Sequence, residues 1–138
     1  MTLNMTELER EVASDEGFMR IPYRCTSGKL SIGYGTNIQD GITKEEALLL
    51  MRYRLGKVVA ALESRLPFWP RLTDDRRRVL ANMGYQLGVG GLMGFKRMLA
   101  ALERGDYEAA AREMLDSKWA KRDTPARAGR MAERMRRG

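Results

Sequence analysis

The chain of 138 residues contains no histidine and only one cysteine. The absence of histidine excludes catalytic triads with an imidazole base and most zinc sites, so acid–base chemistry falls to Asp, Glu, Cys, Tyr or Lys. A single cysteine excludes an internal disulfide and favours a reducing compartment. The sequence also has no glycine-rich phosphate loop. We therefore expect neither a cofactor nor a metal.

The sequence lacks a long hydrophobic run as well. No apolar stretch approaches the roughly 20 residues of a membrane-spanning helix. Residues 1–7 have no basic region followed by an apolar core, so we predict no signal peptide. The length fits one domain or two small lobes in one chain. The net charge of +7 favours an anionic partner such as nucleic acid, anionic lipid or the bacterial cell wall.

Glu16 stands at the end of the first predicted helix. Thr6 followed by Glu9 fits a capping box, and the helical pattern that follows ends at Glu16 and Gly17. The helix dipole is negative at this end, so the placement favours the protonated form of a glutamate, which suits a proton donor. A solvated glutamate at a helix end is the alternative interpretation.

A hairpin is predicted directly after this helix, with a strand at 21–25, a turn at 26–29 and a return strand at 30–35. In the return strand Ser31 shares one face with two glycines, so that face is almost bare and would let a ligand approach the backbone closely. The hairpin therefore predicts that the Glu16 carboxyl, the Cys25 thiol and the Ser31 hydroxyl converge.

Helical periodicity accounts for most of the remaining chain. A second capping box, Thr43 with Glu46, begins a predicted helix over 43–66 that is long enough to be a strut between two parts of the molecule. Thr73 is predicted to cap the next helix, which glycines interrupt from Gly88 onward. Further helices are predicted at 92–102, 107–115 (capped by Asp106) and 125–137.

Three motifs, in this order, resemble the phage-type lysozymes of the T-even phage family, glycoside hydrolase family 24. Glu16, Cys25 and Ser31 have the spacing of that family's Glu, Asp and Thr. Cys25 stands where the family usually has Asp, whereas Ser31 keeps the hydroxyl of the family's Thr. The other motifs are 82–88 followed by Gly94-Phe95, and 117–119 followed by 124–128, so the resemblance covers nearly the whole chain.

The resemblance implies a mainly α, lysozyme-like α+β fold with a cleft between two lobes. Residues 1–138 would form one such domain, with a small β-hairpin lobe at 14–42 and a connecting helix at 43–66. The C-terminal helical lobe would comprise 67–138 together with 1–13. Family members are generally phage endolysins or prophage remnants. The resemblance therefore implies a protein that is made in the host cytoplasm and acts on the cell wall after release.

The implied reaction is hydrolysis of the β-1,4 bond between N-acetylmuramic acid and N-acetylglucosamine in peptidoglycan. Glu16 would be the general acid, oriented by Arg127, and Cys25 and Ser31 would activate or position the attacking water. Cys25 could instead attack the anomeric carbon, or be inert in a decayed site. Three residues are predicted to line the saccharide groove, with core packing as the alternative for the tyrosine: Asn37, Tyr85 and Gln86.

Two other functions stay open at this point. A lytic transglycosylase needs only one acid, because the 6-hydroxyl of the sugar closes the ring. A non-catalytic remnant would bind the cell wall through its basic surface. Nucleic acid is not expected, since the arginines are spread over several predicted helices with little aromatic interleaving. Peptidoglycan glycan strands are the expected partner, and a monomer is the expected state.

Overall fold

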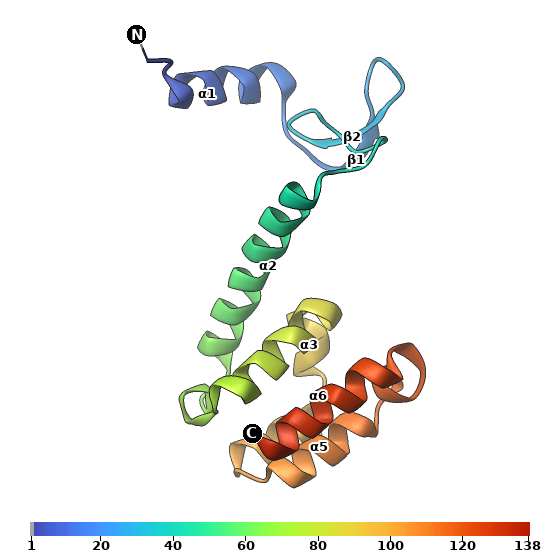
Figure 1. Cartoon of the computed structure of the whole chain (residues 1–138). Coiled ribbons are helices and arrows are strands. Elements are labelled where there is room, and N and C mark those ends of the chain that lie inside the picture. The colour runs from blue at the N-terminus through green and yellow to red at the C-terminus, as the bar shows by residue number, and fades with distance from the viewer. Residues whose placement is uncertain (1) are drawn as a thin grey trace. The chain divides into compact units, whose positions relative to one another are not determined.

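The computed structural model describes residues 2–138 (Figure 1). The chain divides into two compact units, Met1–Leu49 and Leu50–Gly138. The first contains helix α1 (Met5–Glu16) and three short strands, and helix α2 (Lys44–Arg65) begins in it and continues into the second. The remaining helices belong to the second unit. The prediction of a mainly helical fold with a small antiparallel sheet near the N-terminus is confirmed.

Helix α1 begins earlier than the sequence predicted. Its N-cap is Asn4, whose side-chain oxygen accepts a hydrogen bond from the backbone N–H of Glu7 at 3.1 Å. The predicted capping box at Thr6 is therefore wrong, because Asn4 is an equally good cap and leaves Thr6 inside the first turn. The predicted end is confirmed: Gly17 has a φ of 70° and its N–H donates to the carbonyl of Ala13 at 2.9 Å.

The sheet has three antiparallel strands in the order β1 (Met19–Arg24), β2 (Leu30–Gly33) and β3 (Thr36–Asn37). The predicted single return strand over 30–35 is wrong in its last two residues, because β2 ends at Gly33. The φ angles of Gly33 and Gly35 are 69° and 71°, a region that glycine enters at little cost, and they turn the chain into β3. The bare strand face expected from alternation therefore ends at Gly33.

The second capping box is present as predicted. The Thr43 N–H donates to Glu46 Oε1 at 2.8 Å, and the Glu46 N–H donates to Thr43 Oγ1 at 3.1 Å. Two of the N–H groups that a helix start leaves unpaired are thus satisfied reciprocally. Helix α2 then ends at Arg65. A helix end is expected here because Pro67 disfavours helical structure at Leu66, the residue before it.

The second unit is built from α2 and four further α-helices: α3 (Asp74–Met93), α4 (Lys96–Glu103), α5 (Tyr107–Leu115) and α6 (Pro125–Arg137). Short turns of helix, η1 (Trp69–Arg71) and η2 (Trp119–Asp123), complete it. The predicted caps are confirmed at Thr73 and Asp106, which accept backbone N–H bonds of 3.2 and 3.0 Å. The predicted bounds of α5 and α6 are confirmed too. Within the described residues, no helix combines the length and apolar character that crossing a bilayer requires.

Helix α3 continues past its predicted interruption. Gly88 leaves the helical region, with φ 79° and ψ 152°, but the chain resumes helical structure up to Met93. The helix predicted from residue 92 therefore begins only at Lys96. Leu92 is instead buried as part of α3. A kink, rather than an end, results because the apolar residues after Gly88 still gain from burial.

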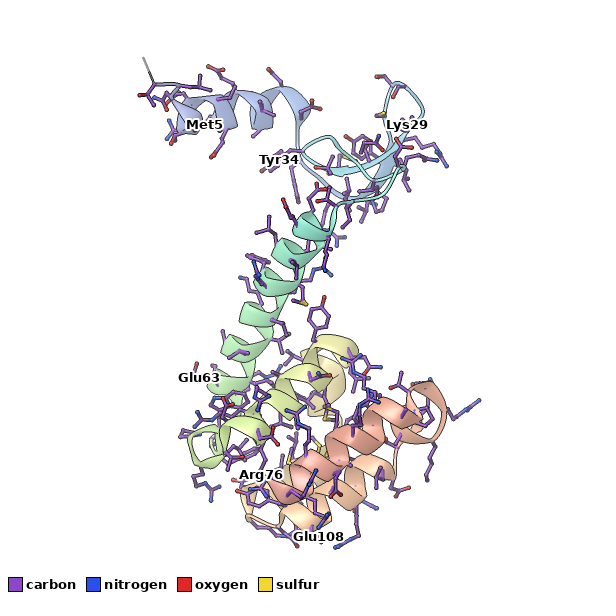
Figure 2. All side chains as sticks on the ribbon, viewed as in Figure 1. Met5, Lys29, Tyr34, Glu63, Arg76 and Glu108 are labelled. Carbon is purple, nitrogen blue, oxygen red and sulfur yellow. The ribbon has the colours of Figure 1, made fainter. Side chains whose placement is uncertain are left out.

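The core of the second unit lies where α6 packs on α3 and α5. Buried methionines and leucines fill it, among them Leu80, Met83 and Met135. Arg76, labelled in Figure 2, stacks on the Tyr107 ring with its guanidinium carbon 3.5 Å from the ring centre. Its Nε donates to the carbonyl of Met135 at 2.8 Å. One arginine thus satisfies a carbonyl at the end of α6, where helices leave carbonyls unpaired.

Gly84 on α3 lets that helix pack closely against α2. A Cβ at Gly84 would lie 2.8 Å from Val58 Cγ1, and valine is stiff at χ1 in a helix. Gly84→Ala should therefore lower the free energy of unfolding by about 1–3 kcal/mol, despite the better helix propensity of alanine. Denaturant unfolding measures this change.

A matched control lies on α2 itself. A Cβ at Gly56 would meet no atom within 4 Å, so Gly56→Ala should stabilise the protein by up to about 1 kcal/mol. In a Val58→Ala background the cost of Gly84→Ala should largely disappear. An equal cost in both backgrounds would contradict this account of the close approach.

Candidate active site

Glu16 is the last residue of α1, and its side chain lies against Gly35. A Cβ at Gly35 would come within 2.7 Å of Glu16 Cδ and nearer still to one carboxylate oxygen. Gly35 also has a φ of 71°, which a residue with a side chain rarely adopts. The glycine that turns β2 into β3 is therefore also the residue that leaves room for the Glu16 carboxyl group.

Cys25 begins the turn of the hairpin. Its N–H donates to the carbonyl of Lys29 at 2.9 Å, and its carbonyl accepts from the N–H of Gly28 at 2.8 Å. Its Sγ lies 3.0 Å from Ser27 Oγ. The Ser27 hydroxyl, followed by the Ser27 backbone N–H, lowers the pKa of the Cys25 thiol to about 7. A larger fraction of the thiol is therefore ionised at neutral pH than in an unassisted cysteine.

Ser31 lies on β2, opposite Tyr23 on one neighbouring strand and Asn37 on the other. It is the one buried polar residue among those described, with 2% of its surface exposed. Its hydroxyl donates to the carbonyl of Lys29 at 3.3 Å. The same hydroxyl makes the smallest of the contributions that lower the pKa of Cys25. The hairpin thus brings the thiol and this hydroxyl together.

Asn37 is exposed on β3, but both ends of its amide are engaged. Its Nδ2 donates to Asp40 Oδ2 at 3.0 Å, and its Oδ1 accepts from the backbone N–H of Gln39 at 2.8 Å. Asp40 also accepts from Lys29 Nζ at 3.4 Å. These bonds fix the amide within the turn that follows β3, so Asn37 presents a rigid surface rather than a free side chain.

Gln86 on α3 joins two segments that are far apart in sequence. Its Oε1 accepts from Trp119 Nε1 at 2.9 Å, and its Nε2 donates to Thr124 Oγ1 at 3.1 Å. Thr124 immediately precedes α6, so Gln86 fixes the approach to that helix. Its neighbour Tyr85 has 42% of its surface exposed, which argues against the interpretation of Tyr85 as core packing.

Arg127 occupies the first turn of α6 and is held by Asn82 of α3. Its Nε and Nη2 both donate to Asn82 Oδ1, at 3.0 and 2.6 Å. Neither Asn82 nor Ser27 was predicted as a site residue, although Asn82 lies in one of the family motifs. The sequence does offer one indication for Ser27. A serine two residues after a cysteine in a short turn can hydrogen-bond to it, because serine side chains often bond to groups nearby in the chain.

The predicted site residues divide between the two units. Cys25 and Ser31 meet in the hairpin of the first unit, where Glu16 is held against a neighbouring turn. Arg127 takes its partner within the second unit. The convergence of Glu16 with the thiol and the ion pair of Glu16 with Arg127 stay predictions.

Two hollows lie away from these residues. One, of about 430 Å³, lies beside the start of α4 and the end of α5 and carries both basic and acidic groups, including Arg97 and Asp116. The other, of about 440 Å³, lies on the apolar face of α1 beside Tyr34, which is labelled in Figure 2. None of the predicted site residues lines either hollow.

Comparison with known proteins gives consistent matches. Residues 13–137 match the phage lysozyme family. The pre-baseplate central spike protein Gp5 of Enterobacteria phage T4 is 37% identical over 99 residues, which are 70% of this chain but 17% of that protein. The endolysin of Acyrthosiphon pisum secondary endosymbiont phage 1 is 29% identical over 110 residues, 77% of this chain and 72% of the endolysin. The probable T4-type lysozyme 2 of Dictyostelium discoideum is 24% identical, with 92% of each chain covered.

The protein is therefore of the lysozyme class, the enzymes that degrade peptidoglycan. The chain belongs to the phage lysozyme family, whose match covers most of its length. A helical fold with a small N-terminal antiparallel sheet agrees with this assignment. The chain spans less than a fifth of the spike protein and most of the endolysin.

Ser27 should control the acidity of the thiol. Ser27→Ala removes the largest contribution that lowers the pKa of Cys25, so this pKa should rise from about 7 towards its ordinary range. The alkylation rate by iodoacetamide at pH 7 should fall several-fold, and its midpoint should move to higher pH. Ser27→Thr keeps a hydroxyl and should retain a low midpoint. An unchanged midpoint in Ser27→Ala would refute the role of this hydroxyl.

Gly35 should be essential to the placement of Glu16. Gly35→Ala forces a side chain into a left-handed conformation, which costs about 1–2 kcal/mol, and also drives the Glu16 carboxyl away. Gly41→Ala is the matched control, because Gly41 has a φ of 90° but a Cβ there would meet no atom within 4 Å. Both variants should lose similar stability in denaturant unfolding, whereas only Gly35→Ala should lose most lytic activity. Equal activity of the two variants would count against the contact.

Proposed function

We propose that the protein is a muramidase that hydrolyses the β-1,4 bond between N-acetylmuramic acid and N-acetylglucosamine. Glu16 is the general acid, and Cys25 and Ser31 hold and activate the attacking water. Arg127 pairs with Glu16 and orients it. Three residues line the saccharide groove in this proposal: Asn37, Tyr85 and Gln86.

The observation that carries the proposal is the thiol of Cys25 in its hairpin. Family resemblance puts this thiol where a carboxylate usually acts, and its pKa of about 7 supplies a base at neutral pH. A general base is most effective when its pKa lies near the working pH. The buried Ser31 hydroxyl beside it offers a second hydrogen-bonding group for a water molecule.

The reaction balances with these groups alone. Glu16 transfers its proton to the glycosidic oxygen while the bond from that oxygen to the anomeric carbon breaks, giving an oxocarbenium-like transition state. Water attacks the anomeric carbon and loses a proton to the Cys25 thiolate. One water is consumed, a reducing N-acetylmuramic acid end is formed, and exchange with solvent returns the thiol and the carboxylate to their starting states.

A thiolate is also a nucleophile, so direct attack of Cys25 on the anomeric carbon is the competing role for this residue. The close serine hydroxyls favour the water-activating role. The hydroxyls of Ser27 and Ser31 near the sulfur can share a water molecule with it, whereas direct attack by the sulfur uses no water. A trapped glycosyl-thioether detected by mass spectrometry of the intact protein would support the covalent role instead.

Analysis of the new glycan ends tests the proposed reaction. Purified peptidoglycan is incubated with the protein, reduced with borohydride and examined by mass spectrometry. Reduced N-acetylmuramic acid ends are expected. Anhydromuramic ends would indicate a lytic transglycosylase, and cell-wall binding without any new ends would indicate a non-catalytic remnant. Glu16→Gln keeps the shape of the side chain, and turnover should fall by ~10²–10⁴-fold because a general acid is lost.

Substitution of Cys25 tests its part in the reaction. Cys25→Asp should remain active with a pH optimum at lower pH, because an unperturbed carboxylate titrates about four units below a thiol. Cys25→Ala should lose most activity while denaturant unfolding shows little loss of stability. Lysis by Cys25→Ala at the wild-type rate would remove the thiol from the mechanism.

A further inference from the structure

The first residue of β2, Leu30, lies beyond the part of that strand that pairs with β3. The ladder between the two strands ends at the pair of Ser31 with Asn37. Beyond it, the Leu30 carbonyl accepts from the Gln39 N–H at 3.1 Å, and the Leu30 N–H donates to Gln39 Oε1 at 3.2 Å. Opposite residues of antiparallel strands exchange two bonds in the same way, from backbone to backbone. The Gln39 side chain thus replaces a strand carbonyl and extends the sheet past the end of β3.

The Leu30 N–H belongs to the same peptide group as the Lys29 carbonyl, which binds two residues of the candidate site. This carbonyl accepts from the backbone N–H of Cys25 at 2.9 Å and from the Ser31 hydroxyl at 3.3 Å. Lys29, which follows the turn of the hairpin, is labelled in Figure 2. A peptide group is planar and turns as a unit, so a bond at its N–H also fixes the direction of its carbonyl. Gln39 therefore holds one end of a peptide group whose other end holds Cys25 and Ser31.

The turn that carries Gln39 is itself fixed by hydrogen bonds. The Gln39 N–H also donates to Asn37 Oδ1 at 2.8 Å, and Asn37 Nδ2 donates to Asp40 Oδ2 at 3.0 Å. The Gly41 N–H donates to the carbonyl of Ile38 at 3.2 Å. The Gln39 side chain therefore starts from an ordered backbone, so less conformational entropy is lost when its amide binds the end of β2.

We propose that Gln39 is a positioning residue that orients the peptide group holding Cys25 and Ser31. The inference rests on the proposed function, in which these two residues hold and activate the attacking water. The backbone of Lys29 and the Ser31 hydroxyl both lower the pKa of Cys25, so a looser peptide group should raise this pKa. A misplaced base should also slow the chemical step more than it weakens substrate binding.

Gln39→Met tests the contact, because it removes the amide oxygen and keeps an unbranched side chain. Gln39 is exposed, so the protein should stay folded, which thermal melting checks. Hydrogen exchange of the Leu30 amide, followed by NMR, should become several-fold faster. On soluble peptidoglycan chains kcat should fall by about tenfold with little change in KM. The midpoint of Cys25 alkylation by iodoacetamide should move to higher pH.

Gln39→Glu is the conservative variant, because a carboxylate oxygen also accepts from the Leu30 N–H. It should keep the slow exchange of the Leu30 amide and most of the wild-type kcat. The kcat values are compared at the pH optimum of each variant, since the added negative charge raises the pKa of acidic groups nearby. Gln39→Lys has no acceptor and should behave like Gln39→Met, which it replaces if the methionine variant does not fold.

Gly41→Ala is the matched control in the same turn. It introduces strain at a φ of 90° and leaves the Gln39 amide in place. It should lower stability but keep the slow exchange of the Leu30 amide, the wild-type kcat and the wild-type midpoint of Cys25 alkylation. An equal fall of kcat in Gly41→Ala and Gln39→Met would overturn the inference, because the effect would then be a general loosening of the turn.

The remaining outcomes separate the inference from the proposed function. Faster exchange of the Leu30 amide in Gln39→Met, with kcat and the alkylation midpoint unchanged, overturns the inference and leaves the proposed function in place. Unchanged exchange in both Gln39→Met and Gln39→Lys also overturns it, since the contact would then not hold the peptide group.

A Cys25→Ala background shows whether Gln39 acts through the thiol. The further loss of kcat caused by Gln39→Met should be much smaller there than in the wild type. An equal loss in both backgrounds overturns the inference, because the side chain would then act elsewhere. Lysis by Cys25→Ala alone at the wild-type rate contradicts the role of the thiol, and the inference then fails together with that part of the proposed function.

Discussion

Burial of one stripe of α6 determines how the second unit is arranged. Four small or flexible apolar residues recur at helical spacing on this helix and are almost entirely buried: Ala128, Met131, Ala132 and Met135. Burying the stripe fixes the rotation of α6 about its axis, and the arginines beside the stripe then face α3. Two of them reach acceptors on α3, and Arg76 reaches back to the end of α6. The hydrophobic pattern therefore sets where the guanidinium groups lie, and the polar contacts select among the orientations left open.

The bounds of most helices could be predicted from the sequence because local chemistry determines them. Thr43, Thr73 and Asp106 are caps in the structure, as their spacing predicted. The first helix was predicted less well, because Asn4 and Thr6 are both good caps and spacing alone does not choose between them. The third strand was missed because two residues are too few to show alternation. The glycines predict an end at Gly88 where the structure has a kink, since a sequence pattern cannot reveal what later residues gain by packing.

The candidate site could be predicted only in part. Resemblance supplied Glu16, Cys25 and Ser31, and the structure brings the last two together in one hairpin. The resemblance could not supply Ser27, because the family spacing concerns Cys25 and Ser31 and says nothing about the turn between them. Nor could it supply the contact of Gly35 with Glu16, which depends on the turn at Gly33 and Gly35. Contacts made by irregular backbone are the part of a site that periodicity cannot describe.

By resemblance Cys25 stands where the family usually has a carboxylate, and a thiol at that position makes different electrostatic demands on the hairpin. A carboxylate is fully charged at neutral pH without help, whereas an unassisted thiol would be almost entirely neutral. The turn supplies part of the difference, first through the Ser27 hydroxyl and backbone and then through the backbone of Lys29, which lower the pKa of Cys25. The turn therefore makes the thiol a stronger acid than an unassisted cysteine, as a group that is to ionise near neutral pH requires.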